Sequence, residues 1–248
     1  MKYFIGNWKM FGVPSSYYIL KKINSYLRAD KNQKKYRVII TPPFTLIESF
    51  SKKLKKSLIK IGAQNCYFKN NFSSDTGAIS PFMLKKINSQ YVIIGHSDNR
   101  AEGDNNKILK DKVKYSLQNN LKVIFCIGEN HKEKKNNKTM VVLNNQLKSV
   151  LYKGIKTNNL IIAYEPIWSI GSGMIPNEKE LLSISINIKK KLKKIFKIKK
   201  SPPLLYGGSV DGTSIKKFKN IKMLDGFLIG GASKSSKKFI DIIKNYYR

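Results

Sequence analysis

A single carboxylate, Glu165, ends an apolar run and is followed by a segment rich in proline, tryptophan and glycine. The run is residues 159–164 (NLIIAY), and the chain continues as PIWSIGSG. A carboxylate at the tip of a buried strand can act as a general base, and a stiff stretch beside a Gly-Ser-Gly stretch can act as a hinged loop over a substrate. The alternative is an ordinary strand-to-helix turn without a catalytic role. The polar residues elsewhere in the sequence distinguish the two interpretations.

Short β-rich runs alternate along the chain with longer, lysine-rich stretches that have helical patterning. The runs are Tyr3–Trp8, Tyr36–Thr41, Leu58–Gln64, Gln90–Gly95, Leu121–Gly128, Leu160–Glu165, Leu204–Gly208 and Gly226–Gly230. The helix candidates are Ser15–Arg28, Phe44–Lys56, Pro81–Asn88, Asn105–Asn119, Lys138–Tyr152, Glu178–Lys194, Thr213–Lys219 and Lys234–Tyr246. This alternation predicts an α/β fold, a single-domain (β/α)₈ barrel over residues 1–248. A doubly wound open sheet is the alternative, but no Gly-x-Gly-x-x-Gly follows the first run.

Polar residues gather where the predicted strands end, which is where the chemistry of such barrels takes place. Scattered polar residues would not be expected to select six strand ends. The positions are Asn7 and Lys9, Gln64 and Asn65, His96 and Ser97, Glu165, Gly207 to Ser209, and Gly230 to Ser233.

The formal charge is +33, which taken alone indicates a polyanion partner such as a nucleic acid. However, 44 of the 48 basic residues are lysine, and they are spread along the predicted outer faces of helices, as in residues 189–194. We interpret this as a compositional bias of a solvated surface and expect no specific nucleic-acid partner. The positive field would attract a phosphorylated substrate.

Two cysteines, Cys66 and Cys126, lie in or beside apolar runs. They predict a reduced cytoplasmic protein without a disulfide framework or metal cluster. A nucleophilic role for Cys126 is the alternative to a buried structural one, and we favour burial. No apolar run reaches 18 residues, and the apolar start is too short for a signal peptide, so we expect no membrane association.

The sequence resembles the triosephosphate isomerase family from end to end. The order and spacing of eight blocks carry the resemblance: residues 6–10 (GNWKM), 62–65 (GAQN), 95–97 (GHS), 126–129 (CIGE), 163–168 (AYEPIW), 170–173 (IGSG), 206–210 (YGGSV) and 230–233 (GGAS). The resemblance implies interconversion of dihydroxyacetone phosphate and D-glyceraldehyde 3-phosphate through an enediol(ate), in glycolysis and gluconeogenesis. It implies no cofactor and no metal.

The resemblance also implies three catalytic roles. Glu165 matches the family base, and His96 matches a neutral imidazole that polarises the carbonyl and shuttles protons between oxygens. Lys9 matches the family lysine that stabilises negative charge on substrate oxygens. We interpret the other histidine, His131, as a solvated residue in a charged loop.

Substrate binding is implied for Asn7 and Lys9, and phosphate binding for backbone amides at Gly171, Ser209, Gly230 and Gly231. The resemblance further implies that Pro166–Ile175, with Trp168, forms a closing lid. Tyr206 and Ser209 would hold the closed lid, and Glu129 would hold Trp168 in the open state.

A homodimer is implied, with Tyr67–Ile79 as the arm that inserts near Lys9 of the partner. The sequence departs from the family pattern at Asp98, Asn99, Ala78 and Met174, and Asp104 stands in for a family glutamate. Asn99 and Ala78 replace an arginine and a glutamate that often pair across the dimer. A different barrel enzyme acting on a phosphorylated sugar or an indole precursor is the alternative function.

Overall fold

Eight parallel strands form a closed barrel in the computed structural model, which describes residues 1–248. Each strand pairs with its neighbours in sequence, and β1 also pairs with β8, which closes the sheet. The strands are β1 (Lys2–Asn7), β2 (Tyr36–Thr41), β3 (Ile59–Ala63), β4 (Tyr91–Ile94), β5 (Lys122–Ile127), β6 (Leu160–Tyr164), β7 (Leu204–Tyr206) and β8 (Gly226–Ile229). The predicted (β/α)₈ barrel is therefore confirmed, and the open-sheet alternative is wrong.

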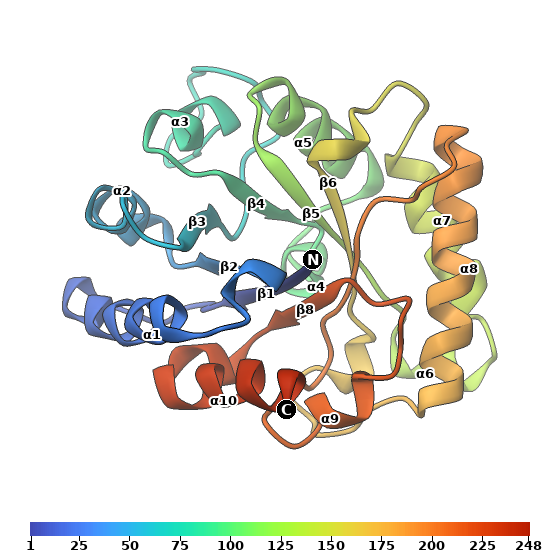
Figure 1. Cartoon of the computed structure of the whole chain (residues 1–248). Coiled ribbons are helices and arrows are strands. Elements are labelled where there is room, and N and C mark those ends of the chain that lie inside the picture. The colour runs from blue at the N-terminus through green and yellow to red at the C-terminus, as the bar shows by residue number, and fades with distance from the viewer.

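The helices other than α4 surround the strands as an outer ring that follows the chain from α1 to α10, whereas α4 lies over the middle of the barrel (Figure 1). They are α1 (Tyr17–Ala29), α2 (Phe44–Lys53), α3 (Pro81–Lys86), α4 (Ser97–Ala101), α5 (Asn106–Gln118), α6 (His131–Lys135), α7 (Thr139–Val150), α8 (Glu178–Phe196), α9 (Ile215–Phe218) and α10 (Ser236–Tyr247). Short 3₁₀ turns are η1 (Pro14–Ser16), η2 (Gln33–Lys35), η3 (Thr157–Asn159), η4 (Ile167–Ser169) and η5 (Gly231–Lys234).

The eight predicted helices are present, but two short helices, α4 and α6, were not predicted. The interpretation of His131 as a loop residue is wrong, because it is the first residue of α6. Asn130 accepts a hydrogen bond from the Glu133 N–H, and the Glu133 side chain accepts one from the Asn130 N–H. This capping box starts a helix where charge alone suggested a loop.

Alternate residues of each strand face two separate apolar regions. In β1, Phe4 packs in the layer between barrel and helices, whereas Ile5 packs inside the barrel. The interior cluster contains ten buried residues and the outer one contains 52, so most of the core lies beneath the helices. Burial on both faces explains why the strands read as nearly continuous apolar runs.

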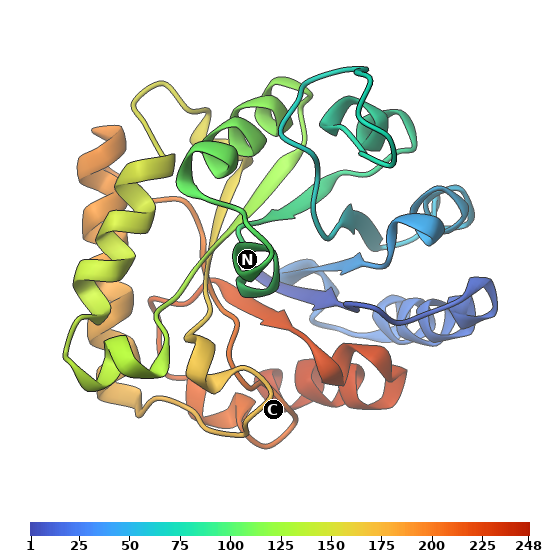
Figure 2. The same cartoon turned by 180° about the vertical axis from the view of Figure 1, so that it is seen from behind.

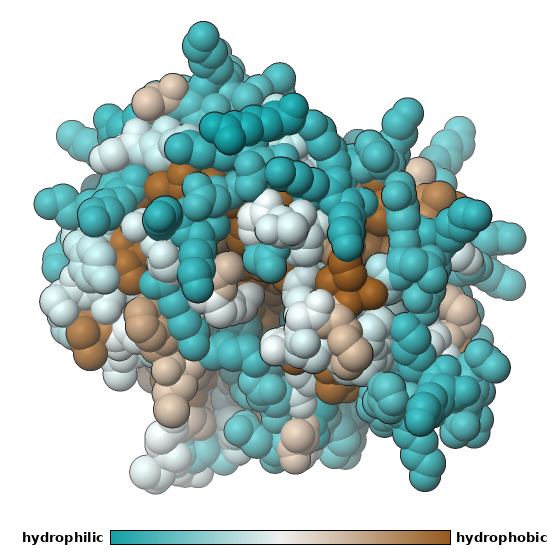
Figure 3. Space-filling model, turned by 90° about the horizontal axis from the view of Figure 1, so that it is seen from below, coloured by the Kyte–Doolittle hydropathy of each residue, from teal (hydrophilic) through white to brown (hydrophobic).

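Long hydrophilic side chains are spread over the face shown in Figure 3, with apolar patches between them. They do not gather at one edge of that face, which agrees with the even distribution of lysine along the sequence. None of the helices combines the length and the apolar composition that crossing a membrane would require.

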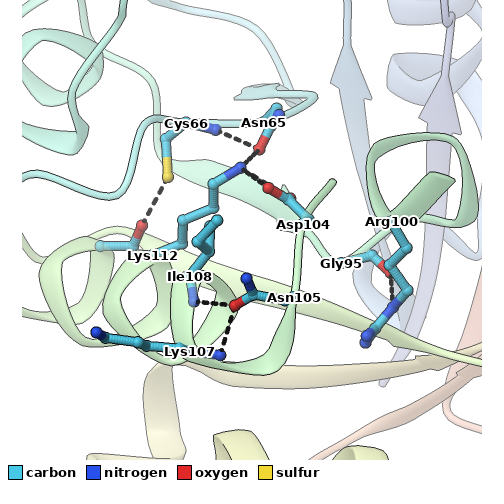
Figure 4. Close-up of polar contacts among 10 residues, drawn as sticks. Asn65, Cys66, Gly95, Arg100, Asp104, Asn105, Lys107, Ile108 and Lys112 are labelled. Atoms are coloured by element: carbon cyan, nitrogen blue, oxygen red, sulfur yellow. Dashed lines mark hydrogen bonds and ion pairs between the residues drawn. The ribbon is translucent and has the colours of Figure 1, made fainter. Parts of the chain in front are cut away.

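One lysine is an exception, because Lys112 of α5 is buried (Figure 4). Its ammonium donates to both carboxylate oxygens of Asp104, at 2.7 and 2.8 Å, and to Oδ1 of Asn65 at 2.9 Å. Asn65 Oδ1 also accepts the N–H of Cys66. The cluster therefore ties the end of β3 to the segment between α4 and α5, next to the strand ends.

We predict that Lys112→Met lowers the free energy of unfolding by about 3–5 kcal/mol, because it leaves the Asp104 carboxylate, whose side chain is 11% exposed, without its cation. Lys107→Met is the matched control, since Lys107 is exposed in the first turn of the same helix; its effect should stay within about 0.5 kcal/mol. Urea denaturation measures both. Equal free energies of unfolding in the two variants would show that the Lys112–Asp104 pair does not stabilise the fold.

Candidate active site

All eight residues predicted to act on substrate line one pocket of about 670 Å³. The pocket lies at the ends of the strands, on the face that carries α4 (Figure 2). The eight residues are Asn7, Lys9, His96, Glu165, Gly171, Ser209, Gly230 and Gly231. They come from five different strand ends and are brought together only by closure of the barrel.

Glu165 follows β6 directly, and its N–H donates to the Ile127 carbonyl at 2.8 Å. Two glycines make room for it: a Cβ at Gly207 would lie 2.6 Å from Cγ of Glu165, and a Cβ at Gly128 would overlap its carbonyl oxygen. The carboxylate is buried, and its Oε2 has no hydrogen-bond partner. No protein donor occupies Oε2, so this oxygen is free to accept a proton from a bound ligand.

His96 lies opposite this carboxylate, with its Nε2 3.8 Å from Oε1 of Glu165, and both side chains are 6% exposed. Its Nδ1 accepts the main-chain N–H of Asp98 at 3.1 Å, at the start of α4. A nitrogen that accepts a hydrogen bond carries no proton, so the proton of the neutral imidazole is on Nε2. The donor of His96 therefore points into the pocket.

Lys9 adopts a left-handed backbone conformation, with φ of 54°, which is uncommon for a residue other than glycine. Its N–H donates to Oδ1 of Asn7 at 3.0 Å, and its carbonyl accepts from Nε2 of Gln64 at 2.9 Å. The Lys9 ammonium donates to Asp98 at 3.1 Å. β1 ends at Asn7, and the turn that follows places Lys9 beside Asn7 in the lining of the pocket.

Backbone glycines form the opposite side of the pocket. A Cβ added at Gly171, Gly230 or Gly231 would meet no protein atom within 4 Å, so the space beside them is open to a ligand. Gly231 begins the η5 turn, whose first N–H groups have no partner within the turn. These features suit an anion such as a phosphate.

The segment 166–175 is held by contacts at both of its ends. The Gly173 N–H donates to Ser209 Oγ at 3.1 Å, and Ser209 Oγ donates to the Ser169 carbonyl at 2.6 Å. At the other end, the Trp168 indole donates to Glu129 at 2.8 Å, and burial raises the pKa of that carboxyl. Both sets of contacts occur together, so the Glu129 contact is not exclusive to an open lid.

Sequence reasoning missed Lys234 and Lys238, which line the same pocket beyond Gly231. The Lys234 ammonium lies 5.5 Å from the ring centre of Phe11, which follows the Lys9 turn. Nothing distinguished these two lysines from the other lysines of the chain. Their position, three and seven residues after Gly231, is the only signal that could have found them.

Cys126 is a free, buried thiol, as predicted. Burial raises the pKa of Cys126 well above its ordinary value, and the neighbouring Glu165 carboxylate raises it further. The thiol form is therefore strongly favoured, which argues against a nucleophilic role.

No group of three His, Cys, Asp or Glu side chains could hold a metal ion.

The chain is similar to known proteins over nearly its whole length. The family model described as "Triosephosphate isomerase" matches residues 2–246. The triosephosphate isomerase of Thermodesulfovibrio yellowstonii is 37% identical over 245 residues, covering 98% of each chain. That of Yarrowia lipolytica is 38% identical, covering 97% of this chain and 96% of its own. A crystal structure of the Bartonella henselae enzyme superposes with a TM-score of 0.90 at 32% identity, covering 100% of this chain and 99% of its own.

We predict that Gly207→Ala lowers catalytic turnover by about 100-fold, because the new methyl group displaces the Glu165 carboxylate by a fraction of an ångström or more. The control is Gly212→Ala, whose Cβ would meet the end of the Asn245 side chain at 3.3 Å and Cβ of Asp241 at 3.7 Å, but no atom of Glu165; its turnover should stay within a few-fold of the wild type. Steady-state kinetics measures both. Unchanged turnover in Gly207→Ala would contradict a tightly positioned carboxylate.

Proposed function

Because this chain belongs to the triosephosphate isomerase family, it interconverts dihydroxyacetone phosphate and D-glyceraldehyde 3-phosphate in glycolysis, and we propose that Glu165, His96 and Lys9 carry out the reaction. One observation supports these roles above the others. A buried carboxylate without hydrogen-bond donors at Oε2 lies 3.8 Å from the Nε2 of an imidazole whose other nitrogen is already an acceptor.

In the proposed first step, the Glu165 carboxylate takes a proton from the substrate carbon next to the carbonyl. The electrons of that C–H bond form the carbon–carbon double bond of an enediolate, and the carbonyl oxygen becomes negative. Protonated Glu165 then returns the proton to the neighbouring carbon. The pocket excludes water around this carboxylate, which strengthens its interactions with the reacting atoms.

His96 would stabilise the developing charge by donating its Nε2–H to the substrate oxygens, and would pass protons between the two oxygens. Neutrality matters here, because a neutral imidazole is a weaker acid than the imidazolium and is closer in acidity to an enediol. Lys9 would add a fixed positive charge on the same side. Its contact with Asp98 is partly exposed, so a substrate oxygen can compete for the ammonium.

Phosphate recognition is proposed for the main-chain amides of Gly171, Ser209, Gly230 and Gly231, with Asn7 positioning the substrate. The first of these lies on the segment 166–175, so binding of the phosphate would stabilise that segment as a closed lid. This coupling would make closure depend on a phosphorylated ligand.

We also propose a homodimer, formed through Tyr67–Ile79. The ends of this arm meet, because the Tyr67 N–H donates to the Ile79 carbonyl at 2.8 Å. Phe72 in the arm is 78% exposed, and Met10, next to Lys9, is 99% exposed. Apolar side chains exposed to this degree suit burial by a second copy. The cytoplasm is the proposed location, since the two cysteines are free and the reaction is glycolytic.

We predict that Glu165→Gln lowers kcat for dihydroxyacetone phosphate by about 10³-fold or more, because the amide cannot accept the substrate proton. The amide has nearly the same shape, so stability and binding of inorganic phosphate should change little. The control is Glu102→Gln, an exposed residue outside the pocket, which should have normal activity. A coupled assay measures kcat for both variants. A kcat of Glu165→Gln near that of Glu102→Gln would refute the assignment of Glu165 as the base.

A second prediction concerns Asp75 in the arm. Hydrogen bonds from Lys69, Ser73 and Tyr67 lower the pKa of Asp75 from 3.8 to about 2. The ionised form thus stabilises the arm fully above the ordinary pKa, and this contribution is lost as the pH falls from about 4 through 2.

We therefore expect Asp75→Asn to raise the dissociation constant of the dimer at pH 7 by about threefold, a modest effect because the contacts are exposed. The difference from the wild type should shrink as the pH falls below about 4 and should be lost only below about pH 2, where Asp75 is protonated in both states. Asp111→Asn, on α5 and outside the arm, is the control for loss of one carboxylate. Analytical ultracentrifugation at two pH values measures the dimer dissociation constant of each variant. If the dissociation constants of Asp75→Asn and the wild type differed equally at both pH values, the charge of Asp75 would not be what stabilises the arm.

A further inference from the structure

A second cavity, of about 620 Å³, lies at the opposite end of the barrel from the catalytic pocket. Its lining includes the first residues of three strands, Tyr36 of β2, Tyr91 of β4 and Lys122 of β5. The cavity is therefore at the end where the strands begin, which faces the viewer in Figure 1. Its volume is within the usual range of small-molecule sites.

The charge around this cavity is positive and uncompensated. Four of its 12 lining residues are basic (Lys34, Arg37, Lys60 and Lys122), and none is acidic. None of the four forms an ion pair within 4 Å, although eight such pairs occur elsewhere in the chain. The cavity thus concentrates positive charge that no carboxylate of this chain neutralises.

The nearest carboxylate that contacts a lining residue is already engaged. Asp30 accepts hydrogen bonds from both Tyr36 and Tyr26, at 2.5 and 3.0 Å. On the other side, burial and the charge of Arg37 both lower the pKa of Lys122. Cations that disfavour each other's charged form would be stabilised by an anion placed between them.

The walls of the cavity are apolar. Tyr36, Tyr91 and Val38 are buried beneath it, and the Leu58 side chain is partly exposed at its side. The Lys122 ammonium lies 5.6 Å from the ring centre of Tyr91. A hollow with an apolar wall and a basic rim complements a molecule that carries both an apolar body and an anionic group.

A comparison within the chain separates this cavity from ordinary clusters of surface lysines. A hollow beside the C-terminal half of α8 is lined by eight residues, five of them lysine, including Lys199 and Lys200. There the lysine Lys189 is paired with Asp225 at 2.7 Å, and only two lining residues are hydrophobic. At the barrel end, six of the lining residues are hydrophobic and the basic residues are unpaired.

We propose that the cavity at the start of the strands binds a small organic anion, with a phosphate, sulfonate or carboxylate group held by Arg37, Lys60 and Lys122 and an apolar or aromatic body against Tyr36 and Leu58. This site is separate from the catalytic pocket and takes no part in the isomerisation. The proposed dimer arm follows β3 at the other end of the barrel and would leave the cavity open.

The test uses 8-anilinonaphthalene-1-sulfonate, an aromatic anion whose fluorescence rises in an apolar environment. It is titrated into the full-length protein without added phosphate or substrate, because such anions would compete with the dye; variants of Lys60 and Lys122, which do not line the catalytic pocket, assign the signal to this cavity. We expect saturable binding of one dye per chain. The double variant Lys60→Gln/Lys122→Gln should weaken the dye affinity about tenfold, from the loss of two charge contacts.

The matched control is Lys199→Gln/Lys200→Gln, which removes the same charge from the surface hollow and should change the affinity less than twofold. Both double variants should keep the wild-type kcat/KM, so the result does not depend on the catalytic assignments. Absence of saturable binding, or equal weakening by both double variants, would overturn the proposal. Equal weakening would mean that the dye responds only to overall charge.

Discussion

The hydrogen bond from the main-chain N–H of Asp98 to Nδ1 of His96 determines what the catalytic pocket can do. It orients the ring and leaves the proton on Nε2, which faces Glu165 across 3.8 Å. The proposed base, Glu165, and the proposed hydrogen-bond donor, His96, are then held beside the same small space before any ligand binds. Such pre-organisation lowers the barrier to proton transfer, because the groups need not reorganise as charge develops.

Closure of the barrel provides this geometry. Glu165 and His96 follow strands β6 and β4, and β5 between these strands pairs with both. Gly128 after β5 and Gly207 after β7 leave the space that the Glu165 backbone and side chain occupy. A rigid cylinder can therefore hold a buried carboxylate with an unpartnered oxygen, an arrangement that a flexible loop would relieve by exposure to water.

Much of the barrel could be predicted from sequence, because strands covered on both faces leave long apolar runs such as those ending at Glu165 and His96. The pocket residues followed from the blocks at the strand ends. The left-handed turn at Lys9 could not be predicted, since one of the hydrogen bonds that hold it comes from Gln64, 55 residues away. Lys234 and the cavity around Lys122 were also missed, because one lysine among many has no local signature and its neighbours come from distant segments.

The central claim is that His96 is neutral, with its proton on Nε2, when it faces Glu165. Nitrogen-15 NMR of the imidazole at pH 7, with His96 assigned by comparison with His96→Gln, tests it most directly. We predict one unprotonated nitrogen, coupled through a hydrogen bond to the Asp98 amide, and one protonated nitrogen at Nε2. Two protonated nitrogens, or a single proton on Nδ1, would contradict the account.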